Sequence, residues 1–117
     1  MALRESQIIN ALIEAGNIGP SRLWRNNIGV ATYRKPKHIQ KVAYGVGGKG
    51  GADLIGFRRG QFVAIEVKSS KSIPLKPHQL QFLTVVKECG GYAAVCYPEN
   101  LSTILNDLTN QDYRGMI

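Results

Sequence analysis

The sequence has 117 residues, of which 44% are hydrophobic, and a formal net charge of +7. This length supports one compact domain with a modest core, so we expect a single domain over residues 1–110 and a frayed C-terminal tail over residues 111–117. No segment is apolar enough to cross a bilayer and no signal-peptide core is present, so we expect a cytoplasmic protein without a membrane partner. The excess positive charge favours an anionic partner, with nucleic acid as the leading candidate.

The first predicted element is an amphipathic helix over residues 4–15, ended by Gly16. Its apolar stripe consists of Ile8, Ile9, Leu12 and Ile13. Glu5 stands at the start of this stripe, which is an unusual position for a solvated acid. Two short strands are then expected over residues 23–26 and 28–33.

The segment from Arg34 to Gly51 is rich in Gly and Lys and has no regular period. We expect it to form a loop that is mobile in the free protein. Its glycines match neither a phosphate-binding Walker loop nor the GxGxxG pattern that follows a strand. We therefore expect no nucleotide cofactor.

Two strands joined by a tight turn are predicted next, over residues 52–57 and 61–68, with Arg58-Arg59-Gly60 as the turn. Because this connection is short, the two strands must be antiparallel neighbours. A helix beginning at Pro77 follows, with Gln79 in its first turn and on its core-facing stripe.

A short apolar strand is expected over residues 92–97 and a final helix over residues 98–108. Helices therefore alternate with strands, and two of the strands form an antiparallel pair. This order predicts an α/β sandwich with a mixed sheet.

Two acidic residues stand alone in a basic field. Between Ala15 and Lys87 there are thirteen Lys and Arg residues but only two acids, Asp53 and Glu66. Since side chains alternate along a strand, Glu66 and Lys68 project from one face, and the predicted hairpin brings Asp53 within reach of both, because adjacent strands are only about 4.8 Å apart. Two carboxylates and a lysine are what metal-assisted phosphodiester hydrolysis needs.

Each of these residues also has a simpler interpretation. Asp53 follows two glycines and fits a turn or cap position. Glu66 and Lys68 fit a surface ion pair on an exposed sheet face. The absence of other acids nearby favours the metal site.

The segments GGADLIG, AIEVKSS and LKPHQ together resemble the PD-(D/E)xK nuclease superfamily and, in detail, its VRR-NUC branch. The similarity runs from the helix containing Glu5, through WRNNIG, to the strand ending near Tyr97. Ala52 stands where the superfamily motif has proline, a position that is loose in this family. The resemblance implies a restriction-endonuclease-like core with a central mixed sheet flanked by helices.

The resemblance also implies roles for individual residues. Asp53, Glu66 and the Val67 carbonyl would bind a divalent ion, and Lys68 would orient the attacking water and stabilise charge on the scissile phosphate. Gln79 matches a glutamine that supports the site, and Glu5 matches a first-helix glutamate with an outer-shell or second-metal role. Oxygen ligands without a placed thiolate or imidazole favour Mg²⁺ or Mn²⁺ as the ion.

Clustered basic residues are the candidate DNA contacts: Arg34, Lys35, Lys37, Lys41, Lys49, Arg58, Arg59 and Lys71. The candidate dimer anchors are Trp24, Tyr33, Tyr44 and Phe57.

Stand-alone members of this branch resemble Holliday-junction resolvases and act as homodimers, and we expect this chain to be of that kind because no further domain is seen in it. It would be a metal-dependent DNA endonuclease that resolves four-way junctions in recombination or repair, in a bacterial or virus-infected host cell. The alternatives are a flap, nicking or less selective DNA nuclease and a non-catalytic nucleic-acid-binding module.

Overall fold

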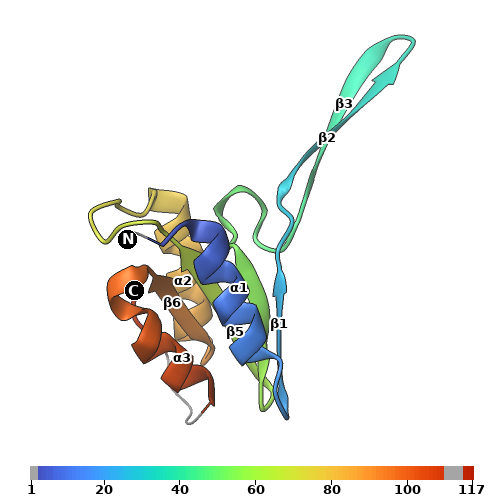
Figure 1. Ribbon diagram of the computed structural model, residues 1–117. Helices are drawn as coiled ribbons and strands as arrows, with labels where there is room; N and C mark the ends of the chain where they lie inside the picture. Colours follow the sequence, from blue (N-terminus) through green and yellow to red (C-terminus); the bar gives the residue numbers. More distant parts are fainter. Residues whose placement is uncertain (1–2, 110–114) are drawn as a thin grey trace.

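A computed structural model describes residues 3–109 and 115–117 (Figure 1). Its main sheet has the strand order β1-β4-β5-β6, with antiparallel neighbours except for the parallel pair β5 and β6. These strands are β1 (Ser21–Arg25), β4 (Leu54–Arg58), β5 (Gln61–Val67) and β6 (Tyr92–Cys96). The helices are α1 (Glu5–Gly16), α2 (Pro77–Glu88) and α3 (Leu101–Thr109). The predicted α/β fold with a mixed sheet flanked by helices is confirmed.

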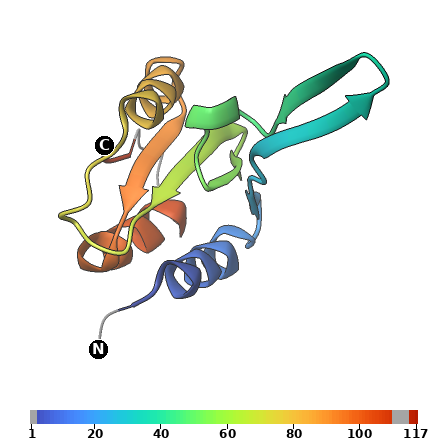
Figure 2. The same cartoon turned by 90° about the horizontal axis from the view of Figure 1, so that it is seen from above.

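Helices cover the two faces of this sheet unequally (Figure 2). One face packs against α1 and α3 through the apolar side of the strands, including Leu23, Leu54, Val63, Ile65 and Tyr92. The opposite face is covered by α2, which packs Leu83 and Val86 on Ala64 and Ala93 of β5 and β6. None of the helices in the described residues has the length and apolar character needed to cross a membrane.

The predicted hairpin of β4 and β5 is present, with a shorter turn than expected. Leu54 pairs with Ile65 and Arg58 pairs with Gln61, so Arg58 belongs to β4 and only Arg59 and Gly60 make the turn. Both turn residues have positive φ, 50° and 81° respectively. This conformation matches the right-handed twist of paired strands and normally selects Asn-Gly or Asp-Gly.

The strand predicted over residues 28–33 is present, but much of the segment expected to be a mobile loop, residues 34–51, is paired with it in a long hairpin. Strands β2 (Gly29–Lys35) and β3 (His38–Tyr44) pair along their whole lengths, from Gly29 opposite Tyr44 to Lys35 opposite His38. The prediction was wrong because this pairing is made by backbone groups and buries almost no side chains, so no alternation of apolar residues marks it. The hairpin projects from the body of the protein (Figure 1).

The glycine-rich remainder of that segment is packed as well. It contains a single 3₁₀ turn, Gly48–Gly50, that lies against α2. Gly47 has a φ of 84° and lies so close to Phe82 that a Cβ would collide with the ring, and a Cβ on Gly50 would collide with the His78 carbonyl. These glycines therefore allow the segment to pack closely against α2.

The end of the chain also departs from expectation. A 3₁₀ turn, Pro98–Asn100, precedes α3, and residues 115–117 lie beside β6, where the Val95 N–H donates to the Met116 carbonyl at 2.9 Å. Met116 is therefore hydrogen-bonded to the edge strand of the sheet. Residues 110–114 lie outside the described part of the chain.

Candidate active site

The two isolated carboxylates meet where β4 begins and β5 ends. Asp53 immediately precedes Leu54, which pairs with Ile65, so it comes to lie beside Glu66 and Val67. The Asp53 Oδ2 accepts the Val67 N–H at 2.8 Å, and the Glu66 Oε1 accepts the Asp53 N–H at 3.1 Å. Each carboxylate thus binds the backbone of the strand that carries the other, which fixes both side chains.

Lys68 and Gln79 complete the same corner. The Lys68 Nζ lies 3.7 Å from the Glu66 Oε2 and donates to the Gln79 Oε1 at 3.2 Å. Gln79 comes from the first turn of α2, where its Oε1 also accepts the Lys76 N–H at 3.0 Å. The glutamine is therefore held by the helix terminus and in turn holds the lysine beside the carboxylate.

The surroundings of Glu66 disfavour its negative charge. Its exposed fraction is only 4%, and it lies between β-branched neighbours on the α2 side of the sheet. Burial raises the pKa of Glu66 to about 8, with the hydrogen bond and charge of Asp53 acting in the same direction and the positive charge of Lys68 opposing them. A positive ion held between the two carboxylates would remove most of this penalty.

The donor atoms fit a hard divalent cation. In a strand, the N–H and C=O of one residue face the same side, so the Val67 carbonyl faces Asp53 as its N–H does. The corner thus offers two carboxylates and a carbonyl, all oxygen ligands of the kind that Mg²⁺ and Mn²⁺ take. Within residues 3–109 and 115–117, no three His, Cys, Asp or Glu side chains are grouped to hold an ion.

Glu5 is not brought into this corner. It is exposed at the start of α1, and α1 packs on the face of the sheet opposite to the one from which Glu66 projects. The interpretation of its sequence position as a sign of burial was therefore wrong. Its proximity to the apolar stripe reflects only that it begins the helix.

Asn26 was missed by sequence reasoning, although it organises the approach to Asp53. Its Nδ2 donates to the Val46 and Ala52 carbonyls at 2.8 and 3.0 Å, and its Oδ1 accepts the Val46 N–H at 3.0 Å. Its own N–H donates to the Asp53 carbonyl at 2.8 Å. One side chain thus joins the end of β1, the exit of β3 and the residue before Asp53. The Asn-Asn pair within WRNNIG is the only sequence signal that pointed to it.

Arg58 is not available as a DNA contact, which corrects the sequence prediction. It is 3% exposed and lies over the Tyr92 ring, with the guanidinium carbon 4.9 Å from the ring centroid. Its guanidinium donates to the Asp107 carbonyl and to the Gln61 Oε1, so it ties the far end of β4 to α3. Period-two alternation from Leu54 through Gly56 was the signal that placed it on the core face.

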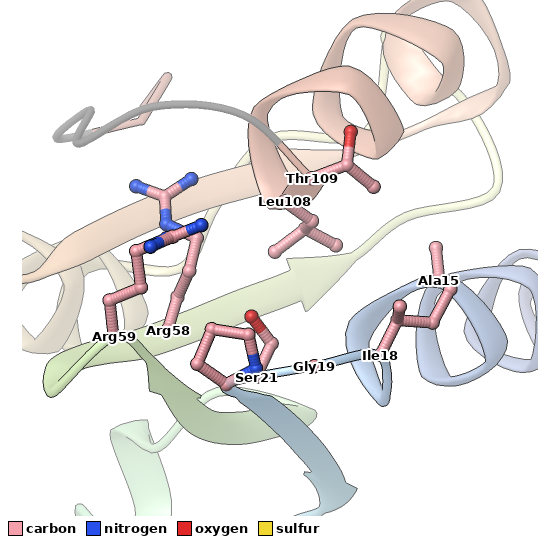
Figure 3. A pocket seen from close by; sticks show the side chains of 9 residues that line it. Ala15, Ile18, Gly19, Ser21, Arg58, Arg59, Leu108 and Thr109 are labelled. Atoms are coloured by element: carbon pink, nitrogen blue, oxygen red, sulfur yellow. The ribbon is translucent and has the colours of Figure 1, made fainter.

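Arg58 and Arg59 also line a shallow cavity of about 200 Å³ at the end of the sheet remote from Asp53 (Figure 3). Ile18, Ser21 and Leu108 form other parts of its wall. Arg59 is exposed in the β4–β5 turn. Since β4 runs from Leu54 to Arg58, the whole strand separates this cavity from the carboxylates.

The other predicted DNA contacts are exposed, and most of them gather on one element. Arg34 and Lys35 lie in β2, Lys37 in the turn, and Lys41 in β3. These four residues form the basic part of the β2–β3 hairpin.

Comparison with known proteins assigns the chain to a family. No curated protein and no solved structure matches it. The model of the VRR-NUC domain matches residues 23–100, which is more than half of the chain and includes all of Asp53, Glu66, Lys68 and Gln79. The chain therefore belongs to the VRR-NUC family of the PD-(D/E)xK nuclease superfamily.

Proposed function

We propose that this nuclease domain is a divalent-cation-dependent, structure-selective DNA endonuclease that resolves four-way junctions as a homodimer. The observation that carries the hydrolytic part is the convergence of Asp53, Glu66 and Lys68 at one corner of the sheet, each held by a hydrogen bond or ion pair. Two carboxylates that face phosphate would repel it, so they would not strengthen a surface that only binds nucleic acid.

The residues divide the chemistry between them. Asp53, Glu66 and the Val67 carbonyl would hold Mg²⁺ or Mn²⁺, which supplies positive charge to polarise the phosphate and to make water more acidic. Lys68 keeps a fixed ammonium beside Glu66, where it orients the attacking water and offsets charge that develops on the phosphate oxygens. Gln79 holds that ammonium in place.

The proposed dimer follows from the need for two cuts. One chain presents one such corner, whereas resolving a four-way junction takes two nicks related by a two-fold axis. The half of the sheet that α2 leaves open offers an apolar surface for such contact: Trp24 and Phe57 are each 49% exposed, and their ring centroids are 6.4 Å apart. Tyr33 and Tyr44, the other predicted anchors, lie on the β2–β3 hairpin.

Cleavage of a set of end-labelled substrates tests the function. Four-way junction, flap, duplex and single-stranded DNA are incubated with wild-type protein and with Asp53→Asn, in Mg²⁺, in Mn²⁺ and in chelator. We expect paired symmetric nicks in the junction that need the cation and disappear in Asp53→Asn. Preferential cutting of flaps or single strands would move the activity to the alternative nuclease, and salt-sensitive binding without any cutting would indicate a non-catalytic module.

Sedimentation of wild-type protein and of a Trp24→Ser, Phe57→Ser double variant tests the dimer. We expect the variant to be monomeric and to nick one strand of the junction at a time, with an unchanged far-ultraviolet circular dichroism spectrum. Arg22→Ser, which changes an exposed polar residue on the same face of β1, is the matched control and should remain dimeric. A monomeric wild-type protein that still makes paired nicks would contradict the proposed dimer.

A further inference from the structure

The β2–β3 hairpin has no partner within its own described chain over most of its length. Every residue from Thr32 to Gly47 is exposed, including large side chains such as Tyr33 (53%) and Ile39 (56%). An isolated two-stranded hairpin is only marginally stable in water, because it orders many residues and buries little surface. Strands of seven residues that pair completely without a covering layer therefore point to a ligand that covers them.

The charge of the hairpin indicates what that ligand is. Arg34, Lys35 and Lys37 lie in its outer half and Lys41 at its middle, and there is no acidic residue anywhere between Glu14 and Asp53. Two copies of this hairpin laid against each other would bring like charges together, which opposes self-association. A polyanion gains from every one of these charges.

The pairing register distributes the cations over both faces. Lys35 and His38 are opposite each other on the face that also carries Tyr33 and Val42, whereas Arg34 and Lys41 lie on the other face. A flat surface ligand would reach only one of these faces. A groove encloses a ribbon on both sides, and the major groove of duplex DNA, about 12 Å wide, admits a two-stranded ribbon between two rows of phosphates.

The hairpin also begins beside the catalytic corner. Asn26, three residues before β2 begins at Gly29, donates its N–H to the Asp53 carbonyl, and its side chain binds Val46 just after β3. Seven paired residues span about 23 Å, which corresponds to about seven base pairs of duplex. Both observations fit an arm that contacts DNA on one side of the cut.

We propose that the β2–β3 hairpin is a DNA-binding arm that lies in the major groove of a duplex beside the scissile phosphate, up to about seven base pairs away. Its basic residues contact the phosphates on the two sides of the groove. This inference rests on the proposed function for the identity of the cut strand, but it concerns binding, and binding is measurable without cleavage.

The first test compares two pairs of charge removals, both made in the Asp53→Asn background so that no substrate is cut. Lys35→Gln with Lys37→Gln removes two exposed cations from the hairpin, and Arg4→Gln with Arg22→Gln removes two exposed cations that lie outside the hairpin and outside the predicted DNA contacts. For duplex DNA, we expect the hairpin pair to weaken binding about tenfold and to lower the slope of log K against log salt by about 2, because each phosphate contact contributes about 0.9. The control pair should change either quantity far less.

The second test varies the length of the duplex. The affinity of the Asp53→Asn protein for DNA should rise as the duplex is extended to about seven base pairs and should then level off. The variant that also carries Lys35→Gln and Lys37→Gln should lose this dependence on duplex length. Equal losses of DNA affinity from both pairs of charge removals, or an affinity that does not depend on duplex length, would contradict the proposed DNA-binding arm.

A Tyr33→Ser, Val42→Ser variant addresses the competing occupant, a second copy of the chain. Conversion of a dimer to monomers with unchanged DNA affinity would overturn the arm and assign the hairpin to self-association. Retention of the wild-type oligomeric state supports the arm. Failure of the proposed function is separately visible: a wild-type protein that shows the expected binding but cuts no DNA leaves the arm intact and removes the endonuclease.

Discussion

The carboxylate corner and the β2–β3 hairpin are neighbours in space but opposite in construction. At the corner, Asp53 and Glu66 are fixed by backbone hydrogen bonds, and Glu66 is almost fully buried. In the hairpin, cations such as Lys37 and Lys41 are exposed and no apolar layer supports the strands. The groups proposed to do the chemistry are thus held in place by the fold, whereas the groups proposed to recognise DNA are free to follow their ligand.

Replacing the lysine of the corner should have the largest effect on activity. Lys68→Met removes the ammonium beside Glu66, and we expect cleavage under saturating substrate to fall by about 10²–10³-fold, the range found when one charge-stabilising donor is lost. Single-turnover cleavage measures this. Lys76→Met removes an exposed lysine eight residues further on and should cut at nearly the wild-type rate. If both variants cleave DNA at the wild-type rate, the corner is not the active site.

The side chain that joins the two regions should affect both. Asn26→Ala removes three hydrogen bonds between β1, Val46 and Ala52, and we expect a loss of about 2–3 kcal/mol in the free energy of unfolding together with slower cleavage. Denaturant unfolding and cleavage assays measure the two effects. Asn27→Ala changes the exposed neighbour and is the control. Equal stabilities of the two variants would show that Asn26 does not couple the hairpin to Asp53.

The raised pKa of Glu66 makes the stability of the corner depend on pH. Because the folded pKa is raised from 4.5 to about 8, this group contributes stability that is complete below about pH 4.5 and is lost as the pH rises through 8. We therefore expect the melting temperature of the metal-free wild-type protein to fall, relative to that of Glu66→Gln, as the pH is raised from 5 to 8. The difference in stability should be at most a few kcal/mol.

Added Mn²⁺ should reverse this trend, because the cation binds the ionised carboxylate and competes with the proton. Thermal melts of both proteins at several pH values, with and without Mn²⁺, measure it. Parallel melting curves for wild type and Glu66→Gln across this pH range would contradict the assigned environment of Glu66.

The smallest effect is expected from the residue that only positions the lysine. Gln79→Ala leaves Lys68 without its amide partner and removes an acceptor for the Lys76 N–H, so we expect about a tenfold loss of cleavage and about 1 kcal/mol of stability. Gln81→Ala, on the exposed side of the same helix, should do neither. A loss of stability without a loss of cleavage would reduce Gln79 to a helix cap.

The sequence predicted those elements in which apolar residues recur with the period of a helix or a strand. The stripe of α1, which leaves the other side of the helix exposed, and the helix that begins at Pro77 were confirmed. Strand β5 was also found where it was predicted, although both of its faces are buried from Val63 to Val67. The meeting of Asp53 with Glu66 followed from the same logic, since a short connection forces antiparallel pairing.

What the sequence left out depends on backbone contacts or on distant parts of the chain. Strands β2 and β3 are paired through backbone groups around the short Pro36–Lys37 turn, and their side chains carry no sign of it. Asn26 acts through carbonyls twenty and twenty-six residues away, which no local pattern reveals. By residue type, Arg58 could not be distinguished from its exposed neighbour Arg59, and only its position in the register of β4 shows that its side chain faces inward.

The connection between β1 and β4 has one further consequence. These strands pair directly, yet the whole β2–β3 hairpin is inserted between them, and the two ends of the insertion are held together where Asn26 donates to Asp53. A closed insertion of this kind can change in length at small entropic cost to the rest of the fold. Evolution can therefore exchange the projecting hairpin, and with it the DNA that the hairpin is proposed to bind, while the corner proposed to cut DNA stays the same.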